Sequence, residues 1–375
     1  MIIHTVVQGD TLYSIGRRYG VTIEQLIAAN GESVQPTLVI GQAVIVPSAS
    51  EKLGNIFVNG YAYPFIDSTV LQGTLPYLST VTPFSYGVNP DGTLVMLDDG
   101  EMIAIAESGG VRPLLLITTL TAEGKFSSQN AAAVLSDPLL TETLVNNILV
   151  QLETRDYYGV DVDFEYIPPE YTAQYTEFIT LLRSKASPLG YKVFVALAPK
   201  TSATQRGLLY EAHNYKTLGD AADYVLIMTY EWGYTYGPPM AVAPLDKVEE
   251  VLRYAITEIP PEKILMGIPN YAYDWTLPFV KGTAADSITN DKAIGLARQY
   301  GAEIQFDTTA MTPYFNYYDE NKRQHVVWFE DARSISAKLE LMRSLNLNGI
   351  SVWNIMSRFV PMYTTINSMF NVVKV

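Results

Sequence analysis

Residues 159–166 read "GVDVDFEY", and three carboxylates occupy every second position of this segment: Asp161, Asp163 and Glu165. Successive side chains of a β-strand point to opposite faces, so the three acids share one face and apolar residues such as Val162 take the other. Side chains two positions apart on a strand are separated by about 6.5–7 Å. Three ionised carboxylates would therefore repel one another, and we expect a shared proton and at least one raised pKa.

Seven further apolar runs of strand length occur in the chain, and helical stretches separate them. The eight runs are "IFVNGYAY" (56–63), "VTPFSYGV" (81–88), "PLLLIT" (113–118), "GVDVDFEY" (159–166), "KVFVALAP" (192–199), "YVLIMTY" (224–230), "KILMGIPNY" (263–271) and "GISVWN" (349–354). Continuous β-rich runs that alternate with helices are typical of parallel strands buried on both faces. Eight such units predict an α/β fold, a (β/α)8 TIM barrel, in which chemistry takes place at the carboxyl ends of the strands. The acids would line the barrel axis, with Glu165 at the mouth.

The interval between the seventh and eighth runs is too long for one βα unit. It contains "PYFNYYD" (313–319) and "QHVVWFE" (324–330), which are joined by "ENKR" and predict a hairpin. We therefore expect a small α+β insertion at about residues 272–330, where it would wall one side of a cleft.

The N-terminal residues have a separate pattern of strand, helix, helix and strand. The first predicted helix is capped by Thr11 or Asp10, the second is capped by Thr22, and "QAVIVP" forms the closing strand. The polar stretch "SASEKLG" that follows is typical of a linker. The expected organisation is a small βααβ module at residues 1–48, a linker at 49–54 and the barrel at 55–375.

Composition limits the classes of partner. The net charge of −14 at pH 7 leaves no basic stripe to neutralise phosphates, so we expect no nucleic acid partner. The chain has no cysteine, and His4, His213 and His325 are scattered, so we expect no metal centre and no cofactor. No apolar run is long enough to span a bilayer, and the N-terminus lacks the pattern of a classical signal peptide. Neutral polymers or small molecules are the expected partners, and the oligomeric state stays open.

The N-terminal module resembles a known glycan-binding module. The segments "VVQGDTLYSIGRRYGVTIEQLIAAN" (6–30) and "LVIGQAVIVP" (38–47) closely resemble LysM. This resemblance implies binding to the N-acetylglucosamine units of peptidoglycan or chitin.

The acidic strand is similar to a catalytic motif. "YGVDVDFEY" matches the D-G-x-D-x-D-x-E strand of glycoside hydrolase family 18, the chitinase-like enzymes, with Tyr158 where the first acid often stands. The resemblance implies that Glu165 protonates the glycosidic oxygen and that Asp163 holds the acetamido group of the substrate. It also implies that Asp161 shares a proton with Asp163.

Further positions extend this resemblance. "LIMTYEWGY" is similar to the sixth-strand M-x-Y-D segment of the family, which implies that Tyr230 contacts the acetamido carbonyl and that Met228 lines the same pocket. Glu231 stands where an Asp is usual, so its contact with sugar is open. Trp353 matches the tryptophan that floors the pocket for the cleaved sugar. The residues that end other strands at this mouth are Tyr61, Asn270 and Tyr271.

A LysM-like module before a family 18-like barrel resembles the bacterial spore-germination glycosidases. The resemblance implies a retaining, substrate-assisted β-N-acetylglucosaminidase of cortex peptidoglycan, associated with the spore coat, the cortex or the cell wall. A hydrolase of chitin oligomers and a catalytically silent glycan-binding coat protein remain alternatives. For the three acids themselves, a divalent metal site and a buried structural network remain alternatives.

Overall fold

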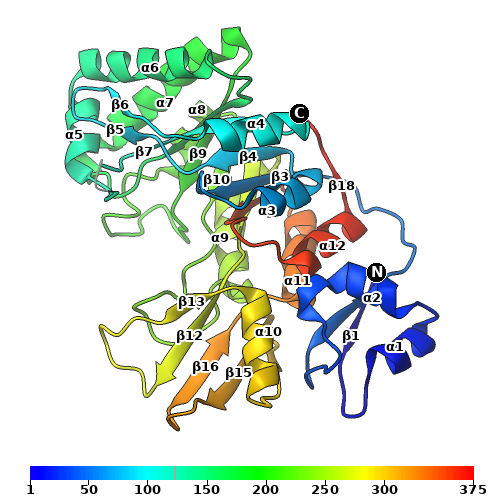
Figure 1. The fold of residues 1–375 in the computed structure, drawn as a ribbon. Helices are drawn as coiled ribbons and strands as arrows, with labels where there is room; N and C mark the ends of the chain where they lie inside the picture. The colour runs from blue at the N-terminus through cyan, green and yellow to red at the C-terminus, as the bar shows by residue number, and fades with distance from the viewer. Residues whose placement is uncertain (122–123) are drawn as a thin grey trace.

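The computed structural model describes residues 1–121 and 124–375, and its central feature is a closed parallel barrel (Figure 1). The barrel strands are β3 (Asn55–Ala62), β4 (Thr80–Pro83), β7 (Arg112–Thr118), β8 (Gly159–Asp163), β9 (Lys192–Leu197), β10 (Tyr224–Ile227), β11 (Ile264–Pro269) and β17 (Gly349–Trp353). β17 pairs with β3 in parallel, with Trp353 opposite Tyr61, and this pairing closes the sheet. The predicted (β/α)8 barrel is therefore confirmed, and each predicted run overlaps one barrel strand.

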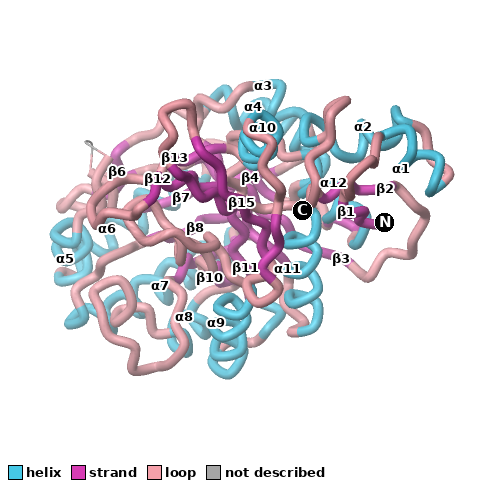
Figure 2. The backbone as a smooth tube through the Cα atoms, turned by 90° about the horizontal axis from the view of Figure 1, so that it is seen from below, coloured by secondary structure: helices cyan, strands magenta, loops and turns pink. Residues whose placement is uncertain are grey.

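Helices surround the barrel on its outer side (Figure 2). They are α3 (Ser68–Thr74), α4 (Gly100–Ser108), α5 (Ser128–Ser136), α6 (Pro138–Leu152), α7 (Thr172–Ala186), α8 (Tyr215–Ala221), α9 (Leu245–Glu258), α11 (Ala332–Ser344) and α12 (Val360–Met369). The apolar side chains form an outer core between strands and helices and a smaller inner core on the barrel axis. Because side chains alternate along each strand, Leu114 and Leu116 of β7 lie in the inner core, while Val160 and Val162 of β8 lie in the outer one.

An antiparallel sheet is inserted between β11 and β17. Its strands are β12 (Ala272–Leu277), β13 (Asp286–Ile288), β14 (Gln305–Asp307), β15 (Thr312–Tyr318) and β16 (Gln324–Trp328), and the same segment contains α10 (Asn290–Gln299). The strands are ordered β13-β12-β16-β15-β14. The predicted hairpin is present, with Tyr318 of β15 opposite Gln324 of β16. The sequence pattern did not predict the other three strands of this sheet.

The N-terminal module has the expected order of elements: β1 (Ile2–Thr5), α1 (Leu12–Tyr19), α2 (Ile23–Asn30) and β2 (Ala43–Val46). Thr11 caps α1 by accepting a hydrogen bond from Ser14 N, and Thr22 caps α2 by accepting one from Gln25 N. Asp10, the alternative cap for α1, instead accepts hydrogen bonds from the Val7 amide and the His4 ring.

The module is docked on the rest of the chain through more than its linker. Arg298 of α10 donates hydrogen bonds to the carbonyl oxygens of Thr37 and Ser33, at 2.8 and 3.0 Å. The Ile304 amide donates to the Ile40 carbonyl at 2.9 Å. Buried apolar side chains of β2 and α11 meet at the same interface. The module therefore contacts both the insertion and the barrel helices.

In residues 1–121 and 124–375, none of the helices is long and apolar enough to cross a bilayer.

Candidate active site

The three acids of the "DVDFE" segment lie along β8 and its carboxyl end. Asp161 is 1% exposed and Asp163 is 8% exposed, whereas Glu165 follows the strand and is partly exposed. The Tyr61 hydroxyl donates a hydrogen bond to Oδ2 of Asp161. Within the described ranges, Oδ1 of Asp161 and Oδ1 of Asp163 are buried without a hydrogen-bond partner. The acids therefore run from the barrel interior to its mouth, as the alternation of the strand predicts.

Burial changes the titration of all three acids. It raises the pKa of Asp161 to about 6, against the lowering effect of the Tyr61 hydrogen bond. Burial, followed by the charges of Glu165 and Asp161, raises the pKa of Asp163 well above its ordinary value. Burial also raises the pKa of Glu165 to about 7. A carboxyl group with a pKa near the working pH is suited to general acid–base catalysis.

Tyr230 faces this acidic cluster from the segment after β10. Its pKa is raised well above the ordinary value by burial and by the charges of Asp163 and Glu165, so the phenol stays a neutral hydrogen-bond donor. Gly267 of β11 makes room for its ring, because a Cβ atom at this position would lie 2.7 Å from Cε1 of Tyr230. Met228 packs against the inner core of the barrel beside these groups.

Trp353 ends β17 and has aromatic neighbours on one side. Its ring centroid lies 4.9 Å from that of Phe84, 5.7 Å from that of Tyr61 and 6.2 Å from that of Tyr63. Trp353 borders two hollows of the barrel mouth, one lined by Asn270 and the other by Tyr63 and Phe84. Tyr61 connects Trp353 to the acids, because its ring lies beside the indole and its hydroxyl donates to Asp161. Tyr63 and Phe84 were not predicted, although "YAYPF" and "TPFSY" show aromatic residues at the ends of two strands.

Glu231 connects the barrel to the insertion. It follows β10 with a φ of +67°, a left-handed conformation that is unfavourable for a residue with a Cβ atom. The Tyr271 hydroxyl donates a hydrogen bond to its Oε1, and the Tyr273 hydroxyl donates to the same atom at 3.2 Å. Sequence reasoning missed Tyr273, although its spacing from Tyr271 places both on one face of a strand.

Asn270 lines the cleft but has a buried amide. It is 2% exposed, and its Nδ2 donates hydrogen bonds to the carbonyl oxygens of Asn354 and Ser357, both at 2.9 Å. The side chain therefore holds the segment that follows Trp353. Tyr61 likewise reaches the reacting region through Asp161.

His213 contacts the backbone of the acidic segment. Its Nδ1 accepts a hydrogen bond from the Ala198 amide at 2.8 Å, so the ring proton is on Nε2, which donates to the Phe164 carbonyl at 2.9 Å. Burial lowers the pKa of His213 to about 4, so the ring stays neutral. Phe164 lies between Asp163 and Glu165, and the histidine therefore fixes the backbone between these acids. Nothing in the sequence pattern pointed to this contact.

Comparison with known proteins identifies two families in this chain. Residues 80–357 match the family model "Glycosyl hydrolases family 18", and residues 4–47 match that of the LysM domain. The chain belongs to glycosyl hydrolase family 18. With its intact acids and barrel, this family 18 chain is a glycoside hydrolase that carries an N-terminal LysM module.

Individual relatives extend over nearly the whole chain. The "Cortical fragment-lytic enzyme" of Bacillus subtilis (strain 168) is 39% identical, with 100% of this chain and 99% of that protein covered. The crystal structure of the Bacillus megaterium QM B1551 spore cortex-lytic enzyme SleL has a TM-score of 0.83 at 35% identity, over 99% of this chain and 87% of that one. A chitinase structure from Chromobacterium violaceum has a TM-score of 0.77 at 23% identity, over 84% of this chain and 98% of that one, and supports the fold alone.

Proposed function

We propose that this enzyme hydrolyses the β-1,4 bonds that follow N-acetylglucosamine in spore cortex peptidoglycan, with retention of configuration and with assistance from the substrate. The observation that supports the proposal is that the charges of Asp163 and Glu165 act on each other and on the buried Tyr230 phenol. A protonated Glu165, an acidic acceptor and a neutral phenol together match the needs of a sugar with an acetamido group. The full-length likeness to proteins named for cortex lysis supports the choice of glycan.

The positions of the acids favour a nucleophile from the substrate. A retaining enzyme that uses its own carboxylate as nucleophile needs it about 5–5.5 Å from the acid, across the scissile bond. Asp163 instead ends β8, and Glu165 follows it two residues later in the same segment. Glu231 accepts hydrogen bonds from two tyrosines on the insertion side. Neither Asp163 nor Glu231 is therefore well placed to attack the anomeric carbon.

In the proposed reaction, Glu165 donates its proton to the glycosidic oxygen as the bond to the anomeric carbon breaks. The carbonyl oxygen of the substrate's acetamido group attacks this carbon and forms a bicyclic oxazolinium ion. Asp163 accepts the hydrogen bond of the acetamido N–H and stabilises the developing positive charge, while the Tyr230 hydroxyl orients the carbonyl. Glu165, now ionised, takes a proton from water as the water oxygen attacks the anomeric carbon; the bond from this carbon to the acetamido oxygen breaks, and the original configuration is restored.

Asp161 has a separate proposed role. It is the most buried of the three acids, and its pKa is raised only to about 6 while the Tyr61 hydroxyl donates to it. We propose that it exchanges a proton with Asp163 as Glu165 changes its charge. The enzyme would work at the cortex or the cell wall, where the LysM module keeps it on the glycan.

Product analysis tests the proposed function. Purified cortex and chitin are incubated with the enzyme, and the new reducing ends are reduced with borohydride and identified. We expect cortex to yield N-acetylglucosaminitol ends after reduction, NMR spectra recorded before reduction to show the β-anomer formed first, and a thiazoline mimic of the intermediate to inhibit competitively. Muramitol ends or an α-anomer would contradict the proposal, and turnover of chitin alone would favour the chitin-directed alternative. If no new reducing ends appear with either substrate, the result would favour a silent glycan-binding protein.

A further inference from the structure

Helix α10 of the insertion contacts the N-terminal module at both of its ends. In its first turn, Asp291 accepts a hydrogen bond from the Ser33 hydroxyl. In its last turn, Arg298 donates a hydrogen bond to the Ser33 carbonyl oxygen at 3.0 Å. Beyond the helix, the Ile304 carbonyl approaches Gly41 so closely that it leaves no room for a side chain there. The module and α10 therefore form one packed unit.

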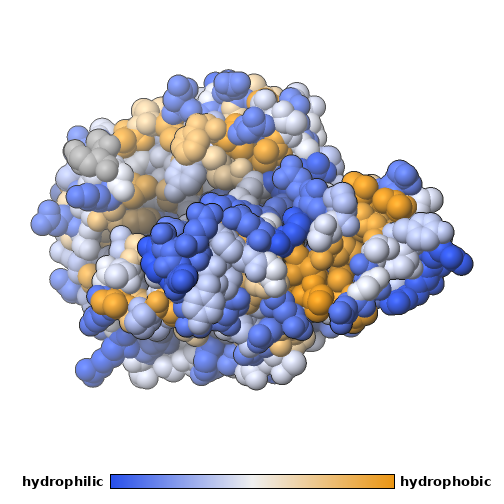
Figure 3. Space-filling model, turned by 60° about the horizontal axis from the view of Figure 1, so that its bottom comes forward, coloured by the Kyte–Doolittle hydropathy of each residue, from blue (hydrophilic) through white to orange (hydrophobic). Residues whose placement is uncertain are grey.

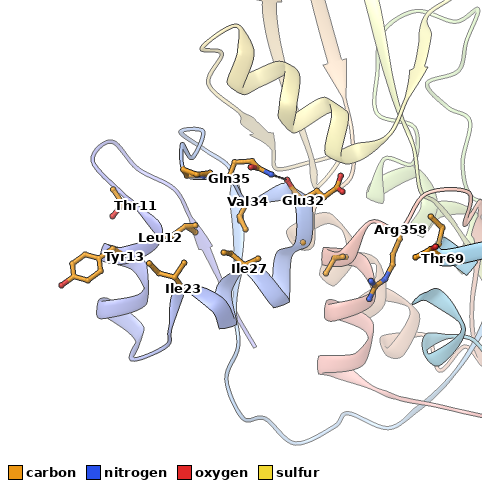
Figure 4. Close-up of a pocket in the computed structure, with 14 residues that line it drawn as sticks. Thr11, Leu12, Tyr13, Ile23, Ile27, Glu32, Val34, Gln35, Thr69 and Arg358 are labelled. Carbon is orange, nitrogen blue, oxygen red and sulfur yellow. Dashed lines mark hydrogen bonds between the residues drawn. The ribbon is translucent and has the colours of Figure 1, made fainter. Parts of the chain in front are cut away.

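Two views of this junction show the same arrangement. Figure 4 shows Glu32 and Gln35 of the module beside the yellow helix, which is α10. Figure 3 shows the module against the rest of the molecule, with apolar surface gathered where the two meet. Ser33 is 1% exposed, so its hydrogen bonds to α10 are shielded from water.

The first residue of α10 faces the barrel instead of the module. Asn290 is 1% exposed, and its Oδ1 accepts a hydrogen bond from the Glu330 amide at 2.9 Å. This bond fixes the orientation of the side-chain amide, so that Nδ2 of Asn290 faces Oδ1 of Asn270 at 3.4 Å. Asn290 therefore connects the helix that contacts the module to the residue that follows β11.

Asn270 in turn holds the segment that begins at Trp353. The backbone amide of Asn270 donates a hydrogen bond to the Trp353 carbonyl at 2.8 Å. Its Nδ2 donates to the carbonyl oxygens of Asn354 and Ser357, both at 2.9 Å. The position of this segment at the barrel mouth therefore depends on where Asn270 lies.

The same segment is tied to the acids. The Ile355 amide donates a hydrogen bond to the Tyr61 carbonyl at 2.8 Å, and the Tyr61 hydroxyl donates to Asp161. Trp353 itself borders both hollows of the barrel mouth. A shift of the segment would therefore displace Trp353 and Tyr61 together.

We propose that Asn290 is a positioning residue for glycoside hydrolysis, which passes the docked position of the module through Asn270 to the Trp353 segment. Both asparagines are buried, and a buried amide that loses its partner costs free energy, so the two side chains must move together or not at all. A module held on α10 thereby keeps Trp353 in place, and it contributes to turnover as well as to retention on the glycan. The inference requires glycoside hydrolysis, and it does not depend on the glycan proposed above.

The experiment measures kcat on soluble cortex fragments for the full chain carrying Asn290→Ala, Arg298→Gln or both. Saturating substrate, well below the unfolding temperature, makes the rate insensitive to weaker glycan binding by the module. We expect Asn290→Ala to lower kcat about tenfold, since small misplacements at a reacting site have effects of this order or larger. Arg298→Gln should lower kcat about threefold, as substitutions along a coupled network do. The double variant should resemble Asn290→Ala alone, because both substitutions interrupt one chain of contacts.

Two control variants separate positioning from a loss of stability. Ile103→Val removes a methyl group from the outer core at α4, and it should lower the unfolding temperature without changing kcat. Arg253→Gln removes a surface pair with Glu249 on α9, and it should change neither quantity. If Asn290→Ala does not fold, Arg298→Gln decides the question alone.

An unchanged kcat in folded Asn290→Ala or in Arg298→Gln would overturn the inference. A double variant whose two losses multiply would also overturn it, since the two residues would then act independently. If the parent cleaves chitin oligomers but not cortex fragments, the proposed glycan is wrong, and the same comparison on chitin oligomers still decides the inference. If the parent cleaves neither glycan, the inference and the proposed function fail together.

Discussion

Raising the pH from 6 to 8 should remove about nine-tenths of the activity of this enzyme. Glu165 must hold a proton to act on the leaving oxygen, and burial raises its pKa to about 7. A group with this pKa is protonated in roughly 91% of molecules at pH 6 and in roughly 9% at pH 8. The rate on a natural glycan should therefore fall about tenfold over this interval, with a limiting slope of about −1 in a logarithmic plot.

The measured quantity is kcat/KM for soluble cortex fragments, determined across this pH range at constant ionic strength. A glycan with a nitrophenyl leaving group is the informative comparison, because its leaving oxygen needs little protonation. With that substrate we expect a clearly weaker decline above pH 7. The profile therefore separates loss of the acid from general damage to the enzyme at high pH.

Glu231→Gln is the matched control for this pH dependence. Glu231 lies outside the acidic segment of β8 and also has a raised pKa, and burial is the main cause of its shift. The Glu231→Gln variant should show the same decline of kcat/KM near pH 7 even if its overall activity is lower. A decline that disappears in Glu231→Gln, or a wild-type rate that stays constant from pH 6 to 8, would refute the assignment of the acid to Glu165.

Four further outcomes are expected. Glu165→Gln should lower turnover by about 10²–10⁴-fold while sedimentation with sacculi still shows binding; a rate above a tenth of wild type would contradict this. His213→Leu should lower kcat and the unfolding temperature together, because two buried backbone groups lose their partner, at a cost of about 1–3 kcal/mol each; an unchanged kcat would show that the contact does not position the acids. Gly267→Ala should lower both kcat and the unfolding temperature, because the added Cβ atom would lie 2.7 Å from Cε1 of Tyr230 and 2.8 Å from the Ile227 carbonyl oxygen; an unchanged kcat would show that the ring adapts. The folded-state pKa of Asp161 is raised from 3.8 to about 6, so its contribution should reduce the free energy of unfolding by about 2 kcal/mol as the pH rises from 4 to 6; denaturant titrations should show a smaller decrease in Asp161→Asn.

The barrel could be predicted because its signals are local. Each buried strand is a short apolar run, and the alternation in "GVDVDFEY" assigns Asp161 and Asp163 to one face without any knowledge of the partners. The caps Thr11 and Thr22 are equally local, since each hydrogen bond spans three residues. These features depend on neighbours in the sequence, and the structure bears them out.

Long-range contacts could not be predicted in the same way. His213 reaches the Phe164 carbonyl across 49 residues, and neither position shows a pattern that indicates the other. The insertion sheet shows the same limit, because β12 begins directly after the seventh apolar run and its partner β16 lies about 50 residues further on. The contact between the module and the rest of the chain could not be predicted either. The linker is polar and gives no sign of it, and the contact is made by Arg298 of the insertion, which is distant in sequence.

The departure from the family pattern at Glu231 fits its surroundings. An Asp is usual at the matching position, and its shorter side chain carries the carboxylate one methylene closer to the backbone. Here the carboxylate of Glu231 meets the hydroxyls of Tyr271 and Tyr273, which come from the start of the insertion. A left-handed residue with a Cβ atom costs about 1–2 kcal/mol, and two hydrogen bonds to a charged group offset a cost of this size. The longer acid and the two tyrosines therefore form one unit, in which the insertion holds the segment after β10 in the conformation that brings Tyr230 to the acids.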